Sequence, residues 1–235
     1  MVVRRYSKAD FEDLLRKAVG DVDSFYAQKF LNYRGVTSDT KERYEDITAE
    51  FVLDNLAVFE NIKTIERQSS YKTKGHEQLI PDDDKINEIK KGAVRRQEEW
   101  LAKSMYGKIY ESLGKVIDFQ VPIKDVHGDK AGKIDLIAFS ESDSALYLLE
   151  FKKPDSKETL LRCVLEAYTY YKQVNQAKLL SDFELPVYSN IIPAVLIYKQ
   201  SFAATSLESP FLQQLRNAFG VSVFLINETG VIEKV

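Results

Sequence analysis

Two apolar segments joined by a short polar turn constrain the fold more than any other feature of this chain. Residues 132–139 read GKIDLIAF, residues 145–152 read ALYLLEFK, and only five residues, SESDS, separate them. Apolar segments of this length favour strands, and so short a connection favours antiparallel pairing. The sequence therefore predicts a β-hairpin at the centre of the fold.

Charged residues interrupt these apolar strands. Asp135 lies inside the first strand, and Glu150 and Lys152 lie at the end of the second. Side chains two residues apart on a strand share a face, and the hairpin can place Asp135 beside Glu150. Neighbouring buried carboxylates repel each other, and a divalent cation would remove that conflict. The alternative is an exposed ion pair between Glu150 and Lys152 at a strand end.

The segments around the hairpin predict an α/β protein with a mixed sheet flanked by helices. We divide the chain into a helical N-terminal region with a polar linker, residues 1–85, and an α/β domain, residues 86–235. Periodicity and turn residues place the elements of this domain in order. We expect a helix over 87–113 stopped by Gly114, a strand over 116–123, the hairpin, a helix capped by Asp155 or Ser156 and ending near 176, a strand over 191–198, a helix over 211–219 and a strand over 221–226.

Composition restricts the chemistry that the chain can carry. One cysteine, Cys163, cannot form a disulfide within the chain or build a zinc site. The two histidines, His76 and His127, lie in polar surroundings; the sequence indicates no partner for either, and we expect both at the surface. Carboxylates are therefore the expected ligands of any metal, and they favour Mg²⁺ or Mn²⁺.

Charge and hydropathy limit the partners and the compartment. The net charge is −3, so a nucleic-acid surface must be a local basic patch. The N-terminus lacks the apolar segment of a signal peptide, and the longest apolar runs are too short to span a bilayer. We expect a cytoplasmic protein without a membrane partner.

Asp135, followed after 14 residues by Glu150-Phe151-Lys152, resembles the D…(D/E)xK signature of the PD-(D/E)xK phosphodiesterases. The order of elements over residues 87–226 is also similar. The resemblance implies a restriction endonuclease-like fold and an Mg²⁺-dependent deoxyribonuclease, with DNA favoured over RNA. Asp135 and Glu150 would hold one or two Mg²⁺ ions, and Lys152 would orient the attacking water. The alternative is an inactive module of the same fold that binds nucleic acid or a protein.

The resemblance further implies a glutamate from the preceding helix as a third metal ligand. Glu98 and Glu99 are the candidates. Glu98 lies three residues before Leu101 and seven before Met105, so it shares their helix face, whereas Glu99 is turned by about 100°. We therefore favour Glu98 as a catalytic and metal-binding residue and keep Glu99 as an accessory candidate. The alternative is that both are solvated and pair with neighbouring cations.

The helix after the hairpin carries a polar stripe. Within it, Glu166-x-x-x-Tyr170 resembles a QxxxY motif of some branches of the superfamily, with glutamate in place of glutamine. Glu166, Tyr170 and Gln173 are accordingly accessory candidates, and the alternative is an exposed ion pair between Arg162 and Glu166.

Basic residues before and within the core are candidates for contacts with a nucleic-acid backbone. The alternative for those before the core is a solvated helix face balanced by the acids at 82–84 and Glu88. The basic candidates are Lys72, Lys74, Lys91, Arg95, Arg96, Lys153 and Arg162.

The N-terminal region is a candidate for target recognition or for homodimer formation.

Overall fold

A seven-stranded mixed sheet forms the centre of the protein, and its strands lie side by side in sequence order. The computed structural model describes residues 5–90, 96–125 and 132–235. Strands β1 to β4 are antiparallel neighbours, β5 and β6 continue the sheet in parallel to β4, and β7 is antiparallel to β6. The strands are β1 (Ile109–Tyr110), β2 (Gly114–Pro122), β3 (Lys133–Ser140), β4 (Ala145–Lys152), β5 (Asn190–Tyr198), β6 (Ser222–Ile226) and β7 (Ile232–Lys234).

The predicted hairpin is confirmed, and the next strand, β5, pairs with β4 in parallel. Strands β3 and β4 pair directly through the turn at 141–144, with Leu136 opposite Leu149. Strand β4 is buried along its whole length. Its odd-numbered residues, including Leu149 and Phe151, pack on one face, while Leu148 packs on the other. Both faces of the sheet are therefore covered.

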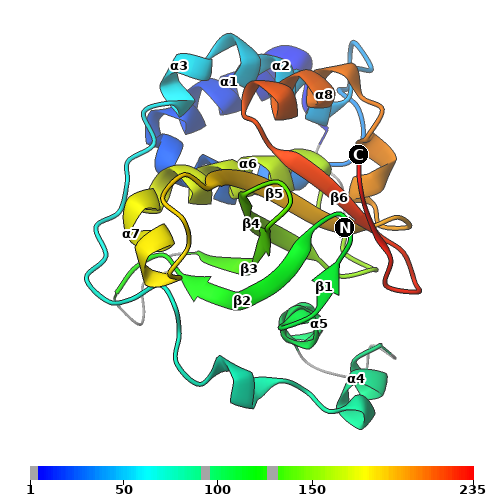
Figure 1. Cartoon of the computed structure of the whole chain (residues 1–235). Helices are drawn as coiled ribbons and strands as arrows, with labels where there is room; N and C mark the ends of the chain where they lie inside the picture. Colours follow the sequence, from blue (N-terminus) through cyan, green and yellow to red (C-terminus); the bar gives the residue numbers. More distant parts are fainter. Residues whose placement is uncertain (1–4, 91–95, 126–131) are drawn as a thin grey trace.

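The sheet curls into a near-barrel (Figure 1). The turn after β1 reaches β7 through the Ser112 hydroxyl, which donates to the carbonyl oxygen of Ile232 at 2.7 Å. Helix α5 (Gln97–Met105) packs against the sheet through Leu101 and Met105. This helix and the strand ends near it frame the site described below.

The crossover from β4 to β5 runs through two helices, α6 (Leu160–Gln173) and α7 (Gln176–Asp182). The expected cap at Asp155 or Ser156 is wrong, because Thr159 caps α6. The Thr159 hydroxyl oxygen accepts from the Arg162 amide at 3.2 Å and donates to the carbonyl oxygen of Leu31 at 2.6 Å. The expected end near residue 176 is also too late, since α6 ends at Gln173 and a separate helix, α7, begins at Gln176. The last helix, α8 (Pro210–Ala218), agrees with the prediction.

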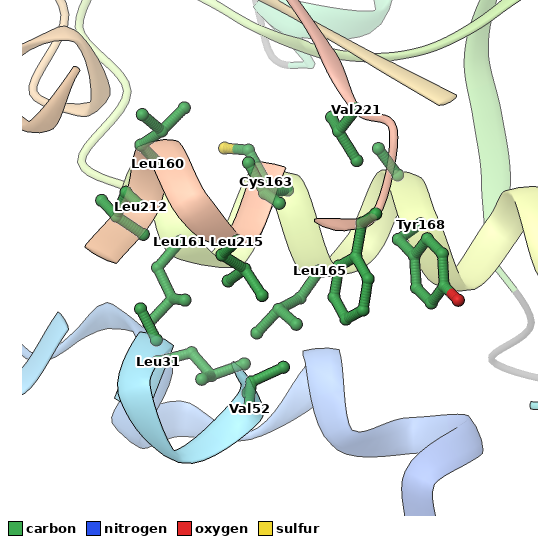
Figure 2. Close-up of a cluster of buried hydrophobic side chains, with 14 of the residues drawn as sticks. Leu31, Val52, Leu160, Leu161, Cys163, Leu165, Tyr168, Leu212, Leu215 and Val221 are labelled. Carbon is green, nitrogen blue, oxygen red and sulfur yellow. The ribbon is translucent and has the colours of Figure 1, made fainter. Parts of the chain in front are cut away.

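The N-terminal region is helical, as predicted, and shares a core with α6 and α8. Figure 2 shows Val52 of α2, Leu161 of α6 and Leu215 of α8 in one buried cluster. Amphipathic helices gain most of their stability from such packing. The division of the chain at residue 85 stays a prediction. The N-terminal elements are α1 (Lys8–Ala18), the 3₁₀ helices η1 (Val19–Ala27) and η2 (Lys29–Asn32), α2 (Tyr44–Asp54) and α3 (Leu56–Phe59).

The single helix predicted over 87–113 is wrong. Helix α4 (Asp83–Lys90) is separate from α5, and residues 91–95 of the predicted helix lie outside the described part. Helix α5 ends at Met105, and Gly107 has a left-handed φ of 76°, which glycine adopts at little cost. The Gly107 amide then donates to the carbonyl oxygen of Val116 at 2.8 Å, which turns the chain toward β2.

Ile109, inside the predicted helix, and Gly114, its predicted stop, have other roles. Ile109 lies in β1 and is 76% exposed. Gly114 begins β2 and does not stop a helix. Its φ is 83°, and an added Cβ would lie 2.2 Å from the Phe139 carbonyl oxygen, so a close approach of two strands requires glycine here. Across the described ranges, no helix is long and apolar enough to cross a membrane.

The segment between α3 and α4 follows the outside of the sheet as a strap (Figure 1). It includes a short 3₁₀ helix, η3 (His76–Leu79), within the predicted linker. Tyr71 is fully buried, and its amide donates to Asp182 at 2.8 Å. Asp125 accepts from the Gln68 and Ser69 amides at 2.6 and 3.0 Å. These contacts attach the linker to α7 and to the segment that follows β2.

Candidate active site

Asp135 lies between residues of both neighbouring strands. The β3–β4 register places it opposite Glu150, and its Oδ2 accepts from the Phe151 amide at 3.0 Å. On the other side, the Gln120 side-chain amide donates to Asp135 Oδ1 at 2.7 Å. Gln120 has a left-handed φ of 48°, which is costly for a residue other than glycine. The sequence placed Asp135 beside Glu150, but it gave no indication of Gln120.

Lys152 and Glu150 form a buried ion pair. Glu150 is 4% exposed and Lys152 is 5% exposed. Their alternation with Leu149 and Phe151 along β4 directs both charged side chains to the same face, as the spacing predicts. The alternative of an exposed pair at a strand end is therefore wrong.

Burial and mutual repulsion dominate the electrostatics of this cluster. Burial raises the pKa of Asp135 to about 7, against an opposing effect of Lys152 and with the help of Glu98. Burial, Asp135 and Glu166 raise the pKa of Glu150 well above its usual range. Burial alone would lower the pKa of Lys152, but Glu150 and its acidic neighbours raise it, so Lys152 stays charged. Asp135 nevertheless keeps partial solvent exposure.

The two candidate glutamates of α5 have different surroundings. Glu98 Oε1 lies 3.5 Å from Lys152 Nζ, and Glu98 Oε2 accepts from the Lys153 amide at 3.0 Å. Glu99 instead pairs with Lys103 at 2.8 Å and with Arg96 at 3.5 Å. The structure thus places Glu98 at the cluster, on the helix face that the sequence favours. Its role as a metal ligand stays a prediction.

Glu158 also belongs to the cluster, although no sequence pattern singled it out. Glu158 Oε2 lies 3.5 Å from Lys152 Nζ and 3.2 Å from Arg162 Nε. Arg162 Nε is also 3.8 Å from Glu166 Oε2, and its side chain is 23% exposed. Arg162 is therefore part of the site's ion network, and the alternative of an exposed Arg162–Glu166 pair is wrong.

The stripe along α6 divides into two parts. The Tyr170 hydroxyl donates to Glu166 Oε1 at 2.8 Å, so the motif-like pair is in contact beside the cluster. An added Cβ at Gly132 would lie 1.9 Å from this hydroxyl, which shows how closely β3 approaches α6. Gln173 turns away, because its side chain donates to the carbonyl oxygen of Asp23 at 3.3 Å. The accessory roles stay predictions.

The predicted nucleic-acid contacts are spread over several surfaces. Lys72 and Lys74 are exposed on the strap, and Arg96 is exposed at the start of α5. Lys153 pairs with Asp155 at 2.9 Å next to the cluster. Lys91 and Arg95 lie outside the described residues. Binding of nucleic acid by these side chains stays a prediction.

His76 has a partner, contrary to expectation. Its Nδ1 lies 2.5 Å from Asp118 Oδ1, and its ring stacks on Phe119 with centroids 4.2 Å apart. The side chain is 12% exposed. Asp118 is buried on β2, where a bulge at Ile117 changes the alternation of the strand. His127 lies outside the described part.

The oxygen donors of the cluster can bind a hard divalent cation only if the Lys152 ammonium moves away from Glu150. Among the described residues, no group of three or more His, Cys, Asp or Glu forms a ready metal-binding arrangement. Asp135 and Glu150 are adjacent oxygen donors, and Glu98 contacts the same ammonium as Glu150. These oxygen donors suit Mg²⁺ or Mn²⁺.

No family model, curated protein or solved structure matches this chain.

Proposed function

We propose that this protein is a divalent-metal-dependent nuclease that hydrolyses phosphodiester bonds of nucleic acid, with DNA favoured over RNA. One observation carries the proposal: Asp135 and Glu150 lie side by side on neighbouring strands, with Lys152 on the same face as Glu150. This is the arrangement that the D…(D/E)xK signature implies.

The charge balance of the site supports the proposal. The acidic side chains in this network are Glu98, Asp135, Glu150, Glu158 and Glu166, whereas its cations are Lys152 and Arg162. An excess of buried and half-buried carboxylates is costly unless protons or cations compensate it. A divalent cation would offset the excess, and the partial exposure of Asp135 leaves it accessible to an ion.

The topology supports a restriction endonuclease-like core. Helix α5 precedes three antiparallel strands, β2 to β4, and α6 leads to the parallel strand β5. The resembled superfamily has the same order of elements. We infer that residues 97–198 contain this core, and that the first and last strands of the sheet extend it.

The chemistry follows from the residues of the cluster. Asp135, Glu150 and Glu98 would hold Mg²⁺ or Mn²⁺, which when bound polarises a phosphoryl oxygen and lowers the pKa of a bound water. Asp135 is held in place by Gln120 and the Phe151 amide. Lys152 would orient the attacking water and stabilise negative charge that develops on the phosphate.

A binding module of the same fold without cleavage is the second candidate. The close contact of Lys152 with Glu150, and its further contacts with Glu98 and Glu158, favour it, because the ammonium already neutralises part of the acid excess. Metal binding separates the two candidates, since a ligand that binds only the folded state raises its melting temperature.

A cleavage assay tests the proposal directly. We expect linear, circular or single-stranded DNA to be cut in the presence of Mg²⁺ or Mn²⁺, and Asp135→Asn to abolish both cleavage and the Mn²⁺-induced rise in Tm. DNA binding without cleavage and without a change in Tm in Mn²⁺ would favour the binding module.

A further inference from the structure

Glu158 contacts Lys152 from a part of the chain that the signature does not include. It lies between β4 and α6, two residues before Leu160, where α6 begins. Its Oε2 faces the Lys152 ammonium at 3.5 Å, is buried, and has no hydrogen-bond partner. Glu150 and Glu98 are the other two carboxylates in contact with this ammonium in the described structure.

The position of Glu158 is set by contacts on both sides. Arg162, one helical turn later, lies 3.2 Å from the same Oε2. The adjacent residue, Thr159, is fixed to the N-terminal region, because its amide donates to Asn32 Oδ1 at 3.2 Å and its hydroxyl donates to the Leu31 carbonyl oxygen. Glu158 is thus held in place without help from the other acids of the cluster.

The three carboxylates around Lys152 therefore differ in whether they can stay paired with the ammonium when a metal binds. Under the proposed function, Glu98 and Glu150 serve a divalent cation, and their charge is no longer available to Lys152. Glu158 Oε2 contacts the two cations Lys152 and Arg162, and Arg162 keeps it beside Lys152. It is the carboxylate that can still hold the ammonium when the other two are engaged.

We propose that Glu158 is a positioning residue that keeps the Lys152 ammonium at the reaction site while Glu98 and Glu150 bind the metal. The inference rests on the proposed nuclease function. It also gives the N-terminal region a defined role, because η2 fixes the backbone next to Glu158. Glu158 acts through Lys152 and needs no contact with the substrate.

A double-mutant cycle on Mn²⁺ binding tests this role without reference to activity. The readout is the Mn²⁺ concentration that gives half of the maximal rise in Tm. Without Glu158, the ion-pair partners left to Lys152 among the described residues are Glu98 and Glu150, and Lys152 competes with Mn²⁺ for them. We expect Glu158→Gln to raise the half-point about 10-fold when Lys152 is present and less than about 3-fold in a Lys152→Ala background, as for coupled neighbours.

Single-turnover cleavage at saturating Mn²⁺ and DNA gives the second readout. We expect Glu158→Gln to slow the chemical step by about 10-fold or more, because a displaced catalytic group loses much of its effect. DNA affinity in Ca²⁺ should stay the same. Glu158→Asp, which keeps the charge but shortens the side chain, should give an intermediate rate. If Glu158→Gln does not fold, Glu158→Asp replaces it in the comparison with the wild type.

Glu12→Gln is the matched control. Glu12 and Arg16 on α1 form an ion pair with the same four-residue spacing, and the Glu12 and Glu158 side chains are 30% and 29% exposed. This variant should leave the half-point and the cleavage rate unchanged.

The outcomes distinguish the two proposals. If the wild type cleaves and binds Mn²⁺, but Glu158→Gln cleaves at the same rate or shifts the half-point equally in both backgrounds, the positioning role is overturned and the nuclease proposal stands. If the wild type neither binds Mn²⁺ nor cleaves, the nuclease proposal fails and this inference fails with it.

Discussion

The substitution Asp135→Asn separates the charge of the site from its shape. Asp135 accepts one hydrogen bond from the Gln120 side chain and one from the Phe151 amide. The new amide can keep both, because its oxygen can accept from Phe151 while Gln120 turns its own amide over and accepts from the new nitrogen. The variant therefore removes a negative charge at little cost in packing or hydrogen bonding.

The magnitude follows from the raised pKa of Asp135. Burial moves this pKa from 3.8 to about 7, so the folded protein favours the protonated form. The resulting stability is fully present below pH ~4 and is lost as the pH rises through about 7. The difference between the two pKa values of Asp135 corresponds to about 4 kcal/mol at most in the free energy of unfolding. Glu150 can take up part of the proton, so we expect a gain of about 2 kcal/mol for the variant at pH 8.

Urea unfolding in EDTA at a series of pH values from 4 to 8 measures this effect. The variant and the wild type should be equally stable near pH 4, and the variant should become the more stable protein as the pH rises. Adding Mn²⁺ at pH 8 should reverse the order, because only the wild type binds the ion. A difference between the two proteins that does not change with pH would refute the electrostatic reasoning.

Asp125→Asn serves as a control of opposite sign. The Gln68 amide and the Ser69 amide and side chain lower the pKa of Asp125 to about 2. A lowered pKa contributes stability that is present above the ordinary value of 3.8 and is lost as the pH falls toward 2. This variant should be less stable than the wild type by a nearly constant amount from pH 4 to 8, and the difference should narrow only when the series is extended below pH 3.8.

Three further predictions concern activity. Cleavage should require Mg²⁺ or Mn²⁺ and stop in EDTA, and undiminished cleavage in EDTA would exclude the carboxylate site. Ca²⁺ should permit DNA association without cutting, because its looser coordination positions water poorly. Glu98→Ala should lower the cleavage rate by at least about 10-fold, as loss of a metal-site residue does. Glu99→Ala should cleave at nearly the wild-type rate, because the Glu99 side chain pairs with Lys103. The reverse result would show that Glu99, and not Glu98, serves the site. Lys152→Ala should still show the Mn²⁺-induced rise in Tm but slow the chemical step by about 100-fold; a wild-type rate would mean that the signature at Glu150 and Lys152 is coincidental.

The sequence was sufficient for the elements whose pattern is local. The hairpin strands, with Glu150 and Lys152 on one face, follow from apolar runs, a short turn and a repeat of two residues. The strand at β5 and the helix at α8 follow from equally continuous patterns. Asp135 opposite Glu150 needs only the register of a tight hairpin. These features depend on residues close together in the chain, so the chain shows them directly.

Only the tertiary structure decided the remaining members of the site. Glu158 reaches Lys152 because Leu31 and Asn32, more than a hundred residues earlier, hold the start of α6. His76 meets Asp118 because the strap crosses β2, and no periodicity links positions 42 residues apart. The helix expected over 87–113 ends at Met105 because the chain folds back onto β2. Contacts between distant segments depend on how the elements pack, and packing lies outside the reach of local patterns.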